Sequence, residues 1–258
     1  MNILLTLAWH TWLEAAHNRL PRFVGIFLLL ALSLTAFIGQ LVMAEAALFQ
    51  SALLGALLRF GSVMTLSLLV ITGMVRALNE GGMWLVLSLS IPRASYFLGK
   101  LAGFSALAVA LAMVCGLALL IYVPGDQVML WGVALACELM IVAAFSLVCA
   151  LALEQVMPAF GAVMGFYILS RTMDALRLMA ADAVERSGAL DLADRMMAGV
   201  IEAIAFILPE LYRFTASDWL VYHVGTGTAL LPILGQTVVY LILLTGVGLL
   251  DLYRKNLS

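Results

Sequence analysis

Charged residues are scarce in this sequence, and three long stretches lack them entirely. Only 11% of the 258 residues are Asp, Glu, Lys or Arg, whereas 65% are hydrophobic and the mean hydropathy is +1.12. No charged residue occurs in residues 23–44, 101–125 or 219–250. Each stretch reaches the roughly 20 residues that an α-helix needs to cross a hydrocarbon layer of about 30 Å. This composition excludes a soluble globular domain and indicates a membrane protein.

Features that would indicate another class of protein are also few. The three cysteines fall in apolar runs, with no disulfide framework or redox motif. The formal net charge of -2 gives no indication of nucleic-acid binding. His10, Glu14 and His17 are ligand-type side chains on one predicted helical face, but the solvated face of an interfacial helix has the same composition. We therefore expect no metal site.

The distribution of charge predicts six transmembrane helices in one all-α domain. The spans are bounded by charged residues, by Pro21 and by the turn signal at residues 124–126. We expect them at about residues 22–42, 56–75, 96–122, 129–153, 155–172 and 225–250. No sequence repeat and no second domain is visible, so the whole chain is expected to form a single integral membrane domain.

Three segments outside these spans have mixed composition. Residues 2–20 predict an N-terminal amphipathic helix that lies in the membrane interface. Residues 76–100 link the second and third spans and are too polar to cross a membrane. Residues 190–207 carry apolar side chains at helical spacing, which predicts an amphipathic outer helix between the fifth and sixth spans. Beyond it, Trp219 and Tyr222 are typical of an interfacial belt.

The positions of the cations indicate how the chain is oriented. Cations precede the first span, occupy the link between the second and third spans and follow the last span, whereas the opposite links at Glu45 and Asp126 contain none. Arg59 lies near the outer end of the second span, where its side chain could snorkel to the surface. The long segment between the fifth and sixth spans is acidic overall, and long segments have little influence on orientation. We therefore expect both termini on the cytoplasmic side.

The link between the second and third spans carries the most informative motif. It reads E-G-x10-P-R-x2-Y-x2-G-K from Glu80 to Lys100. This pattern resembles the ABC-2 type permease family, the transmembrane subunits of certain ATP-binding-cassette transporters, in which a Glu-Gly pair, a short Leu-rich helix, a Pro and a Tyr-x-x-Gly-Lys lead into the third span. The layout of an N-terminal amphipathic helix, six spans and an elaborated outer segment is similar too. Gly82 differs from the Thr usual in the family.

The resemblance implies that this link is a cytoplasmic coupling helix seated in a groove of an ATPase. An apolar side of such a helix and a firm join to the third span are needed for that role. The residues assigned to ATPase coupling are Glu80, Gly81, Met83, Trp84, Leu87, Pro92, Arg93, Tyr96, Gly99 and Lys100. Pro92 is expected to fix the turn and Lys100 to anchor at the lipid headgroups. A plain interfacial loop accounts for most residue types individually, but their order and spacing favour coupling.

The chain itself has no phosphate-binding loop. Its one Gly-Lys pair, Gly99-Lys100, is followed by Leu101 and lacks the required upstream Gly. We therefore expect no catalytic residues and no cofactor in this chain, with ATP and Mg²⁺ bound by a separate ATPase subunit. The resemblance further implies two ATPase copies and a second permease, either an identical copy or a relative, in a bacterial inner membrane.

Glu138 is the most unusual residue within the spans. It lies inside the fourth span with apolar residues on both sides, and an ionisable group in that position indicates a function by default. It could line a substrate path, pair with Arg59 or Arg171, or be protonated. A buried contact between helices is an equally good interpretation.

Three alternatives to an ATP-driven permease remain at this point. A secondary transporter would usually show internal repeats or paired broken helices, which the sequence lacks. A membrane-embedded enzyme would need several polar catalytic residues at one depth, and Glu138 alone does not supply them. An ABC-like complex that drives or signals to a periplasmic assembly without transport would have the same sequence features, including an outer segment that could contact a periplasmic partner.

Overall fold

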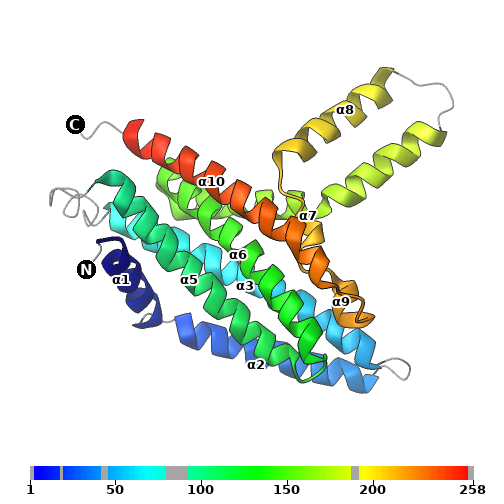
Figure 1. Ribbon diagram of the computed structural model, residues 1–258. Coiled ribbons are helices and arrows are strands. Elements are labelled where there is room, and N and C mark those ends of the chain that lie inside the picture. Colours follow the sequence, from blue (N-terminus) through cyan, green and yellow to red (C-terminus); the bar gives the residue numbers. More distant parts are fainter. Residues whose placement is uncertain (1–2, 18–19, 42–45, 80–91, 187–191, 255–258) are drawn as a thin grey trace.

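The computed structural model describes residues 3–17, 20–41, 46–79, 92–186 and 192–254 (Figure 1). Every regular element in these residues is a helix. Six of the helices are long and apolar enough to cross a membrane. They are α2 (Leu20–Leu41), α3 (Ala46–Asn79), α5 (Arg93–Leu119), α6 (Gly125–Leu153), α7 (Val156–Arg186) and α10 (Leu230–Arg254). The chain is thus an α-helical, multi-pass membrane protein, as its composition predicts.

Helices α3 and α7 are longer than the expected spans. α3 begins at Ala46 and not near Ala56, because the polar residues at its start find partners within the helices. The Gln50 amide donates to the carbonyl of Thr35 on α2 at 3.4 Å, and the Ser51 hydroxyl donates to a carbonyl one turn back, that of Leu48, at 2.9 Å. α7 continues past residue 172 to Arg186.

Helix α6 forms the centre of the bundle. It packs against α3, α5, α7 and α10, and most of its length is buried inside the protein. In contrast, α2 and α10 expose large apolar side chains such as Phe23, Phe37 and Ile242. Apolar surface of this kind is stable only against hydrocarbon or another protein. The chain therefore has a packed centre around α6 and a lipid-compatible exterior.

Helix α1 (Ile3–His17) lies against α5 at the end of the bundle that carries both chain termini (Figure 1). We call this the terminal end. Leu5 and Trp9 on α1 are exposed, while Thr11 is buried against α5. Gly103 of α5 permits the close approach, because a Cβ atom there would lie 2.7 Å from the Thr11 Cβ and 3.0 Å from a backbone oxygen of α1.

The predicted outer amphipathic helix is present as α8 (Leu192–Ile207). It runs back along the second half of α7, and the pair projects from the bundle (Figure 1). Ion pairs of Glu210 hold the base of this projection, with Arg177 at 3.0 Å and Arg213 at 2.9 Å. Hydrogen bonding to Tyr212 raises the pKa of the exposed Arg213 guanidinium above its ordinary value.

Residues 208–221 turn from α8 back into the bundle, and we call them the inserted segment. It contains the short helices η1 (Leu211–Arg213) and α9 (Ser217–Val221), which contact α7 and α3 respectively. Phe214 is fully buried, and Leu220 packs over Gly55 of α3. Trp219 is only 8% exposed, whereas Tyr222 is 67% exposed, and the expected interfacial belt stays a prediction.

The chain leaves the inserted segment through a fixed loop. The Gln127 side chain of α6 accepts from the Gly225 amide at 3.1 Å and donates to the Gly225 carbonyl at 3.3 Å. The short helix η2 (Gly227–Ala229) then leads into α10. Gln127 therefore fixes the start of the last span to the start of the central helix.

Substitution of Gly103 by Ala should loosen α1 from α5. The added methyl group meets backbone as well as side-chain atoms, so we expect a loss of stability of about 1–3 kcal/mol, typical of overpacking. Thermal unfolding of the purified protein measures the effect. Gly161→Ala is the matched control, because a Cβ at Gly161 meets no atom within 4 Å and helix propensity favours Ala. Equal unfolding temperatures for both variants would contradict the close approach.

Candidate functional site

The first candidate site is the predicted coupling segment. The structure describes its end, residues 92–100. Its earlier members, Glu80, Gly81, Met83, Trp84 and Leu87, lie outside the described residues. What the structure adds is how the end of the segment is joined to the rest of the protein.

Pro92 stands immediately before α5 and begins that helix. Its carbonyl accepts backbone hydrogen bonds from Ser95 at 2.9 Å and Tyr96 at 3.3 Å. Proline suits this place because it has a preset backbone angle and the first amides of a helix need no internal partner. Tyr96 and Gly99 are both buried one and two turns later. The segment therefore enters the bundle as a firm helical start.

Arg93 joins this start to the end of α10. Its guanidinium donates to the carbonyl of Leu252 at 3.2 Å and lies 6.0 Å from the ring centre of Tyr253. Carbonyls in the last turn of a helix have no partner within it, and a cation there also interacts favourably with the helix dipole. Nearby, Phe97 of α5 packs directly on Gly248 of α10.

Lys100 joins α5 to the interfacial helix α1. Its ammonium group lies 3.4 Å from a carboxylate oxygen of Glu14, and its side chain is only 12% exposed. Lys100 thus has a carboxylate partner on α1, and the expectation that it anchors at lipid headgroups stays a prediction. Arg93 and Lys100 together connect the end of the predicted coupling segment to α10 and α1.

The second candidate site is a polar cluster formed by the buried residues Glu138 and Thr215 and the half-buried residues Arg59 and Arg171. Each of the three ionisable residues lies in the central third of its own helix, α3, α6 or α7. Thr215 belongs to the inserted segment and is completely buried. Arg59 is about 20 Å along α3 at 1.5 Å per residue, and the expectation that it snorkels to the surface stays a prediction.

Both arginines bind Thr215. The Arg59 guanidinium donates to the Thr215 carbonyl at 3.0 Å and approaches its hydroxyl at 3.3 Å. Arg171 donates to the same carbonyl at 3.1 Å, to the hydroxyl at 3.3 Å and to the carbonyl of Leu211 at 2.6 Å. Irregular backbone inside a membrane must find hydrogen-bond partners within the protein. The two arginines supply them.

Glu138 completes the cluster from the central helix. It is fully buried, and its Oε2 accepts a hydrogen bond of 2.8 Å from the Thr215 hydroxyl. Its Oε1 accepts no hydrogen bond from the described residues, and Tyr167 of α7 is a neighbour within electrostatic range. Thr215 thus stands between one carboxylate and two guanidinium groups, whose formal charges sum to one positive charge.

The cluster is suited to holding chain segments together. It lies within packed helices, and no group of three or more His, Cys, Asp or Glu side chains suitable for a metal ion occurs in the described part of the chain. Its four side chains come from α3, α6, α7 and the inserted segment, so it ties three spans to the segment between α8 and α10. A role for Glu138 in a substrate path stays a prediction.

The sequence identifies part of this cluster. Glu138, Arg59 and Arg171 are visible as charges within apolar surroundings, and the structure brings all three together through Thr215. Thr215 itself is missed, because a Thr in a mixed segment has no distinctive pattern. The only available signal is that two cations and one carboxylate within apolar runs need further polar partners.

Comparison of the sequence with protein-family models and with curated proteins finds no match. The function is therefore inferred from the residues and their geometry, together with the resemblance carried by residues 80–100.

Replacing Thr215 by Val should destabilise the fold. Valine has the same shape but leaves the Glu138 carboxylate without its hydrogen-bond donor, which costs about 1–3 kcal/mol for a buried group. Thermal unfolding in detergent measures this. Thr172→Val is the control, because the Thr172 hydroxyl is exposed on α7 and bonds only to carbonyls of its own helix. A Thr215 variant as stable as the control would show that the bridge contributes nothing.

Replacing Glu138 by Gln should destabilise the protein, because it removes the negative charge of the cluster. Removing one cation as well should restore part of the lost stability. The single substitution leaves two half-buried guanidinium groups without a carboxylate, which we expect to cost about 1–3 kcal/mol. Adding Arg59→Gln removes one of the two cations that lack a carboxylate. The double variant should therefore unfold at a higher temperature than Glu138→Gln alone. Additive losses in this double-mutant cycle would exclude charge coupling.

Proposed function

We propose that this chain is the permease subunit of an ABC-2 type transporter. It moves a substrate across or out of a membrane with energy from ATP that a separate subunit hydrolyses. The observation that carries the proposal is the ordered motif from Glu80 to Lys100 between the second and third of six apolar helices.

The contacts at the end of this motif support a coupling role. An ATPase can move the spans only if the segment it grips is joined firmly to them. Residues 80–91 lie between the last residue of α3, Asn79, and Pro92 at the start of α5. Arg93 and Lys100 extend the join to α10 and α1. A push on the link would thus reach four helices at the terminal end.

The proposed assembly places the terminal end in the cytoplasm. This end carries both chain ends, α1 and the start of α5 (Figure 1). In the sequence, the cations of the short segments precede the first span, occupy the link before α5 and follow the last span, which is typical of the cytoplasmic side. Two ATPase copies would bind at this end, and a second permease copy or a relative would complete the pathway. In a bacterium the membrane would be the inner membrane.

Closure of the ATPases would rearrange the spans as rigid bodies. The polar cluster then decides which parts move together, because it ties α3, α6 and α7 to the inserted segment through Thr215. Rearrangement at the terminal end would be carried along these three helices to the inserted segment.

One observation favours a second candidate, an ABC-like complex that acts on a periplasmic assembly without transport. The projecting pair of α7 and α8 exposes the apolar side chains of Leu178, Met196 and Val200. A projection with exposed apolar residues is a suitable contact for another protein. The ATPase partner would be the same in both cases.

Purification of the tagged full-length chain from its native membrane should bring with it an ATPase that has a phosphate-binding loop. Trp84→Ala, or deletion of residues 84–89, should abolish this association, because a large apolar side chain at an interface often contributes about 2 kcal/mol or more. Mass spectrometry of the purified complex identifies the partner. Glu80→Ala is expected to weaken it, whereas the control Glu45→Ala, in a link on the opposite side, should not.

Absence of any ATPase from the purified wild-type protein would contradict the permease proposal. Retention of the ATPase by the deletion variant would place the coupling surface elsewhere. An ATPase together with a periplasmic protein, and no substrate movement in vesicles, would favour the second candidate.

A further inference from the structure

An apolar groove runs between α5 and α6 in the half of the bundle away from the terminal end. Its volume is about 400 Å³ and it is open to the surface, which is within the range of about 300–1,000 Å³ for small-molecule sites. The residues that line it lie between Val109 and Leu120 on α5 and between Gly125 and Ala136 on α6, and all of them are apolar or glycine. None of them belongs to the polar cluster around Thr215.

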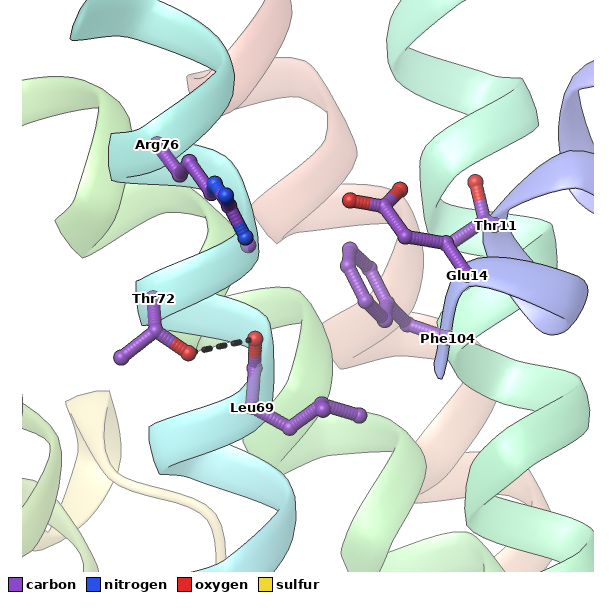
Figure 2. A pocket seen from close by; sticks show the side chains of 7 residues that line it. Thr11, Glu14, Leu69, Thr72, Arg76 and Phe104 are labelled. Carbon is purple, nitrogen blue, oxygen red and sulfur yellow. Dashed lines mark hydrogen bonds between the residues drawn. The ribbon is translucent and has the colours of Figure 1, made fainter. Parts of the chain in front are cut away.

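A pocket at the terminal end has the opposite character. It lies between α1, α3 and α5, and Figure 2 shows Glu14 and Arg76 on either side of Phe104. Its volume is about 90 Å³, and its Glu14 carboxylate pairs with Lys100. Of these two hollows, the groove between α5 and α6 is therefore the one with room for a large apolar ligand.

Small residues form the floor of the groove and larger side chains form its rims. Ala112 and Gly116 of α5 are buried, whereas Leu117 of α5 and Met129 of α6 are exposed. A Cβ atom added at Gly132 of α6 would meet no atom within 4 Å, so the groove is open at its middle. This shape accommodates a narrow apolar chain that lies lengthwise between the two helices.

The length of the groove distinguishes a lipid chain from the transmembrane helix of another protein copy. Between Val109 and Leu120, α5 rises about 17 Å at 1.5 Å per residue. This is about half of a hydrocarbon layer of roughly 30 Å, which corresponds to one leaflet. A partner helix crosses the whole layer, whereas an acyl chain extends through one leaflet only. The groove therefore matches an acyl chain whose headgroup lies at the turn between α5 and α6.

A carboxylate stands at this turn. Asp126 follows Gly125, the first lining residue of α6, and its side chain is exposed. The carboxylate accepts a hydrogen bond of 3.1 Å from the Gln127 side chain, and it forms no ion pair with Lys or Arg in the described part of the chain. An exposed carboxylate of this kind can accept further hydrogen bonds from a ligand that carries N–H groups.

The surroundings of Asp126 contain no competing cation from Lys or Arg. The described residues at this end of the bundle are 30–41, 46–58, 110–135 and 216–235, and none of them is Lys or Arg. The arginines next to these ranges along the chain, Arg59 and Arg213, are bound to Thr215 and Glu210 respectively. A headgroup that presents a cation is therefore complementary to this end of the groove.

We propose that the groove holds one acyl chain of phosphatidylethanolamine, with the ammonium group of the headgroup bound to the Asp126 carboxylate. The ammonium group brings three N–H donors and a positive charge to the carboxylate. Phosphatidylglycerol has a phosphate but no cation, so Asp126 repels its headgroup. The bound lipid fills the space between α5 and α6 within one leaflet. This proposal is independent of the transport function.

The test is lipid binding to the purified full-length chain, followed by native mass spectrometry during titration with phosphatidylethanolamine or phosphatidylglycerol of the same acyl chains. Wild-type protein should prefer phosphatidylethanolamine. Asp126→Asn should weaken that binding about threefold, as for an exposed ion pair, and should remove the preference. Asp218→Asn is the matched control, because Asp218 is also exposed in the first turn of a helix but does not adjoin the groove. His223 lies within electrostatic range of Asp126, so the titration is made at pH 8, where imidazole groups are largely neutral.

A second variant tests the groove without changing its charge. Gly132→Leu places a side chain in the open middle of the groove. It excludes about two methylene groups of the acyl chain and should weaken phosphatidylethanolamine binding about tenfold. Gly161→Leu is the matched control, because Gly161 lies on α7 outside the groove and a Cβ there also meets no atom within 4 Å. Unfolding temperatures show that each variant is folded.

Unchanged phosphatidylethanolamine binding in either folded variant, Asp126→Asn or Gly132→Leu, would overturn the proposal. Equal affinity of the wild-type protein for the two lipids would overturn it as well. If Gly132→Leu instead changes the mass of the protein from that of a dimer to that of a monomer and leaves lipid binding intact, the groove receives a second copy of the chain and the lipid proposal is wrong.

Discussion

The hydrogen bonds of Thr215 are the constraint on which the inserted segment depends. Irregular backbone within a membrane protein is stable only when its carbonyls and amides have partners inside the protein. Thr215 meets this requirement from both sides, because its carbonyl and hydroxyl accept from Arg59 and Arg171 while the hydroxyl donates to Glu138. Buried charges are costly unless they are bonded, so the arginines and the segment need one another.

Two regions of polar contact join different elements of the fold. At the terminal end, Arg93 and Lys100 join the start of α5 to α10 and α1. Near the middle of α3, α6 and α7, the cluster around Thr215 joins these helices to the chain between α8 and α10. Apolar packing supplies the contact between the spans. However, an apolar side chain is stabilised almost equally by lipid and by another helix. The few polar contacts therefore fix which elements stay together when the helices rearrange.

Local composition predicts the spans well but not their long-range partners. Six spans follow from apolar runs that contain at most one charged residue each, because hydrocarbon excludes charge wherever a helix faces it. The start of α3 and the burial of Trp219 could not be predicted in this way, since both depend on residues distant in the sequence: Gln50 reaches α2, and the inserted segment lies against α3. The ion pair of Lys100 could not be predicted from local composition either. Its partner, Glu14, is 86 residues away.

Hydrogen–deuterium exchange of the purified protein tests the central claim, that the polar cluster holds the inserted segment inside the bundle. Peptides covering residues 211–221 should exchange as slowly as those from the middle of α6, because protected amides exchange only when the structure opens. The neighbouring residues 222–228, most of which are exposed, should exchange fast. Fast exchange throughout residues 211–228 would contradict the account.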